Sequence, residues 1–186
     1  MKVLLVAINA KYIHSNLAVY TLRAYAKKMG LEVEIAEYTI NNYTEEIMAD
    51  IYKKNPDFIG FSCYIWNIDY VEEIARELNK VLPDTHIWYG GPEVSYNSMD
   101  YLANHSYVEG IMIGEGEETI CELISHYENN ESDDKLQNIL GLVTRINGEI
   151  VSTGLRQYID MDSVPFVYSD LSEFENKIIY YESSRG

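Results

Sequence analysis

The amino-acid sequence predicts an α/β fold, namely a flavodoxin-like, doubly wound, five-stranded parallel sheet in the order 2-1-3-4-5. Through the first 128 residues, apolar runs of strand length alternate with segments that have helical periodicity. The apolar runs are continuous, as expected for parallel strands that helices cover on both faces. Because crossover connections are right-handed, few topologies suit such an alternation, and we expect the stated strand order.

Five segments have the composition of buried parallel strands. They are Lys2 to Ile8, Leu31 to Ala36, Phe58 to Ser62, His86 to Tyr89 and Gly110 to Ile113. Four further segments repeat apolar residues at helical spacing. They run from Ala18 to Met29, from Thr44 towards Pro56, from Asp69 to Leu82 and from Ile120 to Tyr127. Thr44 is expected to cap the second of these helices, and Asp69 with Glu72 resembles a capping box for the third.

The last third of the chain has a different character. Two short apolar segments flank Asn147-Gly148, which is the strongest hairpin signal in the sequence. We therefore expect a first domain at residues 1–128, an acidic linker at 129–138, a β-hairpin at 139–153 and a connector at 154–186. The connector lacks sustained periodicity and contains Pro165.

The composition excludes several classes of protein. The 186 residues include 14 Lys and Arg against 30 Asp and Glu, which gives a formal net charge of −16. Such a charge repels phosphate backbones and anionic membrane surfaces, so we expect neither nucleic acid nor membrane as a partner. No apolar run reaches the roughly 20 residues that cross a bilayer, and the first apolar run is too short for a signal peptide. We therefore expect a cytoplasmic protein.

Cys63 and Cys121 are the 2 cysteines of the chain, and they lie far apart without CxxC spacing. The sequence therefore signals no disulfide framework, no zinc site and no iron-sulfur site, and we assign no metal ligand. Buried thiols are the ordinary interpretation of such residues. Cys63 is kept as a candidate site residue because it follows a predicted strand, in a loop expected to face a ligand.

Two loops at strand ends are the most informative part of the sequence. The first, Ser62 to Asn67, carries Tyr64 and Trp66, whereas the second, Tyr89 to Glu93, has two glycines at its centre. Carboxyl ends of neighbouring parallel strands meet at one sheet edge, which is where open α/β sheets bind ligands. The pairing of aromatic side chains with bare backbone suggests a large, flat, partly apolar ligand.

Several common ligands do not suit the loop after the first strand, Asn9 to Ser15. It contains no glycine, whereas a dinucleotide site needs GxGxxG there. Ser15 is its single serine or threonine, whereas a flavin mononucleotide site needs several such hydroxyl groups around the phosphate. Clustered aspartates, as in a phosphorelay receiver, are missing from the strand ends, and the chain has no Walker motif.

Three ordered motifs instead resemble the cobalamin-binding domain at the front of many radical S-adenosylmethionine enzymes. They are Pro56 to Ser62, Gly90-Gly91-Pro92-Glu93 and Gly114-Glu115-Gly116-Glu117, and the resemblance covers roughly residues 1–128. In that family the corrin lies over the carboxyl ends of the strands, and the nucleotide tail runs between sheet and helices. The resemblance implies that Ser62 hydrogen-bonds the tail, and that the glycine pair lets the tail pass without a Cβ clash.

The resemblance and the loop positions together give a set of expected cofactor contacts. They are Asn9, Tyr12, His14, Ser62, Cys63, Tyr64, Trp66, Gly90, Gly91, Pro92, Gly114, Glu115 and Gly116. The three aromatic residues have two possible roles. They could contact the apolar face of the corrin, or they could be ordinary surface residues of a tyrosine-rich chain. Glu115 also suits the start of a helix, where a negative side chain relieves the helix dipole. No residue of this chain is expected to be catalytic.

His14 leaves three alternatives open. In methionine synthase and the mutases, a histidine within DxHxxG ligates cobalt from below, but the loop here matches neither the aspartate nor the glycine of that motif. Contact with the corrin or its amides is the second alternative, and a solvated histidine at the start of a helix is the third.

The segment from Tyr180 to Gly186 resembles the lead-in to the cluster-binding CxxxCxxC segment of the same family. This implies an amino-terminal domain whose parent enzyme carries a radical S-adenosylmethionine domain in cis, with a 4Fe-4S cluster and S-adenosylmethionine. The parent would be a methyltransferase or would catalyse another radical transformation, and the fragment alone would not turn over substrate. A self-contained protein is the alternative.

Two functions from other classes remain open. One is a nucleotide or nucleotide-sugar binding half-domain of a glycosyltransferase-like enzyme, in which Gly90-Gly91 and Gly114-Glu115-Gly116 would approach phosphates. The acidic surroundings and the missing basic clamp disfavour it. The other is an interaction module whose acidic surface docks a basic partner.

Overall fold

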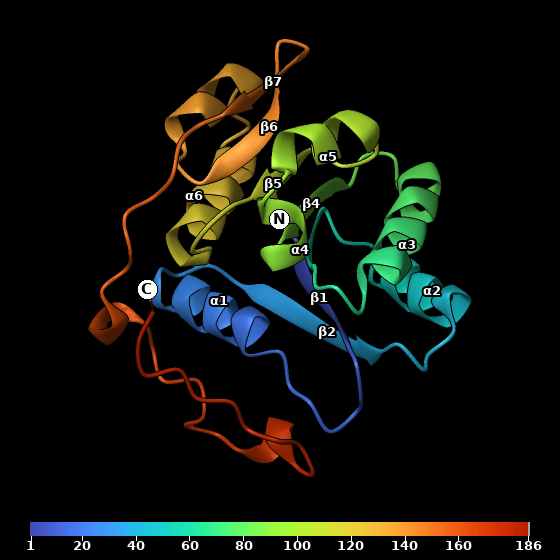
Figure 1. Ribbon diagram of the computed structural model, residues 1–186, viewed down its shortest axis with the longest axis vertical. Coiled ribbons are helices and arrows are strands. Elements are labelled where there is room, and N and C mark those ends of the chain that lie inside the picture. The colour runs from blue at the N-terminus through green and yellow to red at the C-terminus, as the bar shows by residue number, and fades with distance from the viewer. Residues whose placement is uncertain (186) are drawn as a thin grey trace.

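The computed structural model describes residues 1–185, which form a single seven-stranded sheet with helices on both faces (Figure 1). The strand order is β2-β1-β3-β4-β5-β6-β7. The first five strands are parallel to one another in the predicted order. They are β1 (Val3–Asn9), β2 (Val33–Thr39), β3 (Phe58–Ser62), β4 (His86–Gly90) and β5 (Gly110–Met112).

The five predicted parallel strands and the predicted hairpin are confirmed, and the hairpin extends the same sheet to seven strands. It consists of β6 (Leu142–Ile146) and β7 (Glu149–Ser152), and β6 pairs antiparallel with β5. The predicted turn is present, with positive φ angles of 52° at Asn147 and 84° at Gly148. The hairpin covers the edge of the short strand β5, which would otherwise expose unpaired backbone groups.

Six α-helices in residues 1–185 cover the two faces of the sheet. They are α1 (Leu17–Lys28), α2 (Thr44–Lys54), α3 (Ile68–Val81), α4 (Pro92–Ser95), α5 (Ser98–Asn104) and α6 (Glu117–Glu128). Apolar residues of α2 to α5 join one core cluster, and those of α1 and α6 join another on the opposite face. No helix in residues 1–185 is long and apolar enough to cross a membrane.

The helix starts differ in detail from the prediction. Tyr43, not Thr44, occupies the N-cap position of α2, and Asn67, not Asp69, occupies that of α3. The Asn67 side chain does not cap the helix in the usual way. Its Oδ1 accepts a hydrogen bond from the backbone amide of Tyr64 at 2.8 Å, and its Nδ2 donates to the carbonyl oxygens of Ile8 and Ser62. Asn67 therefore ties the loop after β3 to the end of β1.

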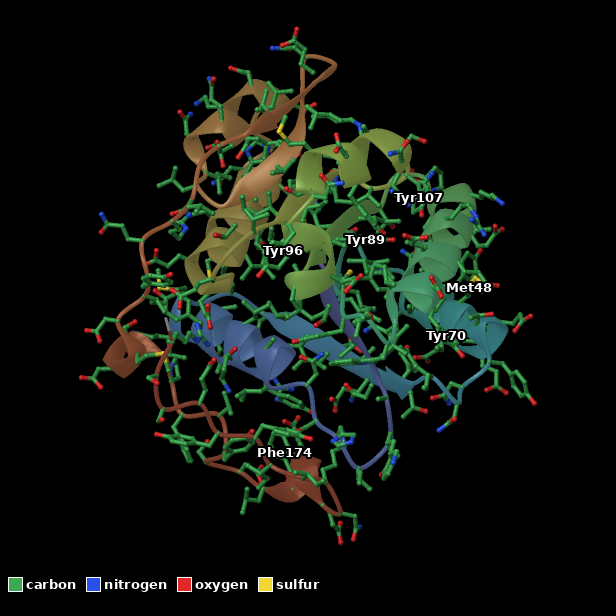
Figure 2. The ribbon with its side chains drawn as sticks, in the orientation of Figure 1. Met48, Tyr70, Tyr89, Tyr96, Tyr107 and Phe174 are labelled. Carbon is green, nitrogen blue, oxygen red and sulfur yellow. The ribbon has the colours of Figure 1, made fainter. Side chains whose placement is uncertain are left out.

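The carboxyl-terminal third packs against the domain. Residues expected to be a linker include a 3-10 helix, Asp133–Asn138, whose Leu136 is buried in the core. Figures 1 and 2 show the final segment returning past α1, with Phe174 on its inner side. The Phe174 ring lies 4.7 Å from that of Tyr20 on α1, and Ile178 forms a β-bridge with His14. The end of the chain therefore lies against the loop that follows β1.

Candidate functional site

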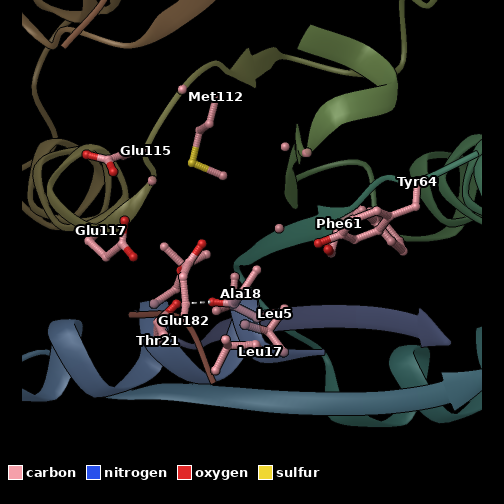
Figure 3. A pocket seen from close by; sticks show the side chains of 18 of the residues that line it. Leu5, Leu17, Ala18, Thr21, Phe61, Tyr64, Met112, Glu115, Glu117 and Glu182 are labelled. Carbon is pink, nitrogen blue, oxygen red and sulfur yellow. Dashed lines mark hydrogen bonds between the residues drawn. The ribbon is translucent and has the colours of Figure 1, made fainter. Parts of the chain in front are cut away.

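A glycine-lined cavity of about 390 Å³ lies between the sheet and helices α1 and α6 (Figure 3). Its sheet side is made by residues at the carboxyl ends of β3, β4 and β5 and in the loops that follow, namely Gly60, Ser62, Gly90, Gly91, Met112, Gly114, Glu115 and Gly116. Leu17, Ala18 and Thr21 of α1 lie on the opposite side. Ser62 and Gly90 are direct partners in the β3–β4 register, so the two predicted loops converge.

The backbone of the loop requires a glycine at position 91 but not at position 90. Gly91 has a φ of 113°, and a Cβ there would stand 2.4 Å from the carbonyl oxygen of Cys63, so the loop itself requires glycine. A Cβ at Gly90 would meet nothing closer than the Met112 carbonyl oxygen at 3.7 Å, which is an ordinary contact. The absence of a side chain at Gly90 therefore enlarges the cavity without being needed by the fold.

A second cavity, of about 460 Å³, opens at the tips of the strands. It shares Leu17, Ala18 and Tyr64 with the first cavity and is lined further by Asn9, His14, Asn16, Trp66 and Tyr180. The rings of Tyr64 and Trp66 stack with centroids 4.5 Å apart and an interplanar angle of 9°. Trp66 Nε1 donates a hydrogen bond of 3.3 Å to the Ile8 carbonyl oxygen. The stacked pair forms a flat aromatic wall fixed to the end of β1.

Asn16 joins the two cavities and was not predicted. It precedes α1, but its side chain does not cap the helix. Its Nδ2 instead donates a hydrogen bond of 3.1 Å to Ser62 Oγ, and its Oδ1 is buried without a hydrogen-bond partner in the described residues. Asn16 and Ser62 are far apart in the sequence, and an asparagine before a helix is normally interpreted as an N-cap. No sequence signal therefore indicated that Asn16 belongs to the site.

Glu37 organises the loop after β1. It accepts hydrogen bonds from Asn9 Nδ2 at 3.0 Å, from the Asn16 amide at 3.1 Å and from the Tyr20 hydroxyl at 2.5 Å, and it pairs with Lys177. Burial by itself raises the pKa of Glu37, but these hydrogen bonds outweigh it and hold the pKa below its ordinary value. Asn9 therefore contributes to the site mainly by holding the loop.

The carboxyl-terminal segment reaches both cavities. In the strand-tip cavity, His14 Nδ1 hydrogen-bonds the hydroxyl of Tyr180. In the glycine-lined cavity, Arg185 Nη2 lies 2.7 Å from Glu117 Oε1, and its Nη1 lies 3.5 Å from Glu115 Oε1. Half-buried Glu115 and buried Glu117 thus lie beside the cavity, where the two carboxylates share one arginine of the same chain.

Three predicted contacts do not line either cavity. Cys63 is wholly buried in the core on the opposite face of the sheet, because neighbouring residues of an extended chain point to opposite sides. Burial raises the pKa of its thiol. Pro92 is the first residue of α4, and Tyr12 is 67% exposed on the loop after β1. The described residues contain no group of three or more acidic, histidine or cysteine side chains able to hold a metal ion.

A doubly wound sheet with a glycine-lined cavity at its carboxyl edge defines a ligand-binding α/β domain. Residues 3–124 match the family model described as the B12 binding domain, and the chain belongs to this family. The match covers all five parallel strands and all six helices but for the last residues of α6.

Curated relatives are much longer than this chain. The 2-(S-pantetheinyl)-carbapenam-3-carboxylate methyltransferase of Streptantibioticus cattleyicolor is 31% identical over 108 residues, which are 55% of this chain and 15% of that protein. The cobalamin-dependent radical SAM methyltransferase TokK of Streptomyces tokunonensis is 31% identical over 70 residues, 38% of this chain and 10% of that protein. This chain therefore spans a small part of the length of these relatives.

Among solved structures, the fold is similar to the cobalamin-dependent S-adenosylmethionine radical enzyme OxsB with aqua-cobalamin and S-adenosylmethionine bound. The TM-score is 0.73 at 19% sequence identity, over 88% of this chain and 24% of that one. The likeness extends beyond the length of the family match, so part of the carboxyl-terminal third shares in the similar architecture. At this level of identity the comparison supports the fold.

Proposed function

We propose that this chain binds cobalamin, with the corrin across the strand tips and the nucleotide tail in the glycine-lined cavity. The observation that carries the proposal is the open space at Gly90, where the fold itself would tolerate a Cβ. A flat macrocycle with a dangling nucleotide needs two adjoining spaces, and the cavities of about 390 and 460 Å³ share three lining residues. Family membership supports the same ligand.

The residues present fit this cofactor chemically. Ser62 Oγ borders the glycine-lined cavity and offers a hydroxyl to the tail, while Gly114 and Gly116 leave room beside it. The flat wall of Tyr64 and Trp66 suits contact with the apolar face of the corrin. Bound cobalamin supplies the organometallic cobalt chemistry, and the chain's own residues bind and orient it.

His14 has a specific place in this proposal. Its Nδ1 is engaged by Tyr180, and its ring lines the strand-tip cavity. We assign it contact with the corrin or its amides, because its loop lacks the DxHxxG motif of the histidines that ligate cobalt. The contact would be made through Nε2, since Tyr180 engages Nδ1. The Tyr180 contact would then position the ring.

We further propose that this domain is part of a cobalamin-dependent radical S-adenosylmethionine enzyme. That enzyme would be a methyltransferase or would catalyse another radical transformation. A domain in cis would hold the 4Fe-4S cluster and S-adenosylmethionine. The lengths of the relatives named above support this, because each is several times longer than the matched region. The predicted lead-in to that domain ends at Gly186, which lies outside the described residues.

The test is a calorimetric and spectroscopic titration of the 186-residue chain with hydroxocobalamin, with a nucleotide sugar as the comparison ligand. Saturable binding of the corrinoid at micromolar concentrations, without binding of the nucleotide sugar, is the expected result. The reverse pattern would establish the alternative of a glycosyltransferase-like half-domain. The acidic pair Glu115 and Glu117 beside the cavity disfavours that alternative, because a diphosphate would be repelled there.

A further inference from the structure

Asn16 carries an unmet hydrogen-bonding requirement inside the proposed site. The residue is 7% exposed, and its Oδ1 is buried with no donor within reach among the described residues. Buried polar side-chain atoms are nearly always hydrogen-bonded, and an unpaired acceptor costs free energy. Such an atom in a cavity wall calls for a donor from a ligand.

The position of Asn16 is fixed by contacts that a ligand does not supply. Its backbone amide donates to Glu37 Oε1 at 3.1 Å, and its side-chain Nδ2 donates to Ser62 Oγ at 3.1 Å. Glu37 is itself held by Tyr20 and Asn9. Because Nδ2 is hydrogen-bonded to Ser62, Oδ1 on the other side of the same planar amide points away from that contact.

The pair of Asn16 and Ser62 lies where the two cavities meet. Asn16 lines the strand-tip cavity, Ser62 lines the glycine-lined cavity, and their hydrogen bond links the two walls. The hydroxyl of Ser62 accepts from Asn16, so its own proton is free to donate into the glycine-lined cavity. The Asn16 side chain therefore determines which hydrogen-bonding groups face each of the two cavities.

We propose that Asn16 is a cobalamin-contacting residue with two separable actions, an inference that rests on the proposed function. Its Oδ1 accepts a hydrogen bond from a carboxamide at the edge of the corrin, which carries several such donors. Its Nδ2 holds Ser62 Oγ as an acceptor, so that the serine proton points to an acceptor on the nucleotide tail. The first action recognises the ring and the second recognises the tail.

The experiment titrates the full chain with two corrinoids, cobalamin and cobinamide, because cobinamide keeps the corrin carboxamides but lacks the nucleotide tail. Asn16→Ala removes both actions. It is expected to weaken cobinamide binding by about tenfold, as for loss of one net-favourable hydrogen bond, and to weaken cobalamin binding by more than that, because cobalamin also loses the tail contact. Asn16→Asp keeps the acceptor but withdraws the donor. It turns the serine proton towards the new carboxylate, so cobalamin binding weakens by about tenfold while cobinamide binding is retained.

Two further variants calibrate the result. Ser62→Ala is expected to repeat the pattern of Asn16→Asp, with loss confined to cobalamin. Asn97→Ala is the matched control, because Asn97 is exposed and its side chain makes no capping hydrogen bond. Circular dichroism melts of every variant establish that the chain is folded, and Asn16→Asp carries the test of the second action if Asn16→Ala does not fold.

The outcomes separate the inference from the function on which it rests. If the wild-type chain binds neither corrinoid, the proposed function is wrong. If the wild-type chain binds and folded Asn16→Ala binds both corrinoids unchanged, the inference is wrong while the proposed function stands. Loss of cobalamin binding alone in Asn16→Ala would overturn the contact between Oδ1 and the corrin carboxamide.

Discussion

Arg185 and Glu117 form an ion pair at 2.7 Å beside the glycine-lined cavity, although Glu117 begins α6 and Arg185 lies in the carboxyl-terminal segment. Glu117 is 3% exposed, so Arg185 supplies the positive charge that its burial requires. Arg185→Met is expected to lower the free energy of unfolding by about 1–3 kcal/mol, since it leaves a buried carboxylate unpaired. Urea denaturation at neutral pH measures the loss.

The matched control for that variant is Lys80→Met, which breaks an exposed ion pair between Lys80 and Glu77 on α3. Exposed pairs contribute little to stability, so the control is expected to lose much less than Arg185→Met. Equal losses would show that the carboxyl-terminal segment does not hold Glu117 in solution.

The two neighbouring glycines are expected to respond oppositely to substitution. Gly90→Leu fills the cavity where the fold tolerates a Cβ, so it should abolish cobalamin binding while the melting temperature changes little. Gly91→Ala places a Cβ 2.4 Å from the Cys63 carbonyl oxygen at a φ of 113°, so it should destabilise the chain by about 2–3 kcal/mol. Calorimetric titration and thermal melts distinguish the two effects. A Gly90→Leu variant that is folded and still binds cobalamin would exclude this cavity as the tail site.

Glu37 gives the stability a defined dependence on pH. Burial by itself raises the pKa of its carboxyl, but hydrogen bonds from Lys177, Tyr20 and Asn16 outweigh it, and the net pKa is lowered from 4.5. A carboxyl with a lowered folded pKa stabilises the protein above its unfolded pKa, and that contribution is lost as pH falls through the folded pKa. The free energy of unfolding should therefore decline as the pH is reduced below about 4.5, the ordinary value.

In Glu37→Gln this contribution is removed at every pH. The variant is expected to be less stable than wild type by roughly 1 kcal/mol at neutral pH, and the difference should shrink as the medium is acidified. Urea denaturation at a series of pH values measures both quantities. A difference that stays constant down to strongly acid pH would mean that Glu37 is not held in its ionised form by these partners.

The sequence predicted the features that depend on strand periodicity. Continuous apolar runs indicated a parallel sheet, and the carboxyl ends of neighbouring strands had to meet, so the convergence of Ser62 and Gly90 was predictable and is confirmed. Contacts of the loop after β1 were not predictable. Asn16 and Glu37 reach the site from separate segments, and only tertiary packing brings them together.

Two other differences have simple physical reasons. Cys63 follows Ser62 directly in an extended chain, so if Ser62 faces the cavity its neighbour faces the opposite core. The alternation could have excluded Cys63 from the sequence alone. The return of residues 154–185 over α1 had no periodic signal, because this segment packs through scattered rings such as Tyr168 and Phe174 instead of through a regular face.

The thiols provide the last prediction. Cys63 is fully buried and its raised pKa keeps it protonated at neutral pH, where the thiolate is the reactive species. Cys121 is 6% exposed, lines a surface hollow on α6 and has a pKa raised by burial to about 11. We therefore expect both to resist iodoacetamide in the native protein and both to react quickly in denaturant.

Their order of reaction tests the placement of the loop after β3. Cys121 needs only a small local opening to react, whereas Cys63 is covered by the sheet and its helices, so Cys121 should be labelled first. Mass spectrometry of peptides after timed labelling gives the two rates, and Cys63→Ser and Cys121→Ser variants confirm the assignment. Native labelling of Cys63 ahead of Cys121 would mean that the loop carrying Ser62 to Asn67 opens in solution and does not form a fixed cavity wall.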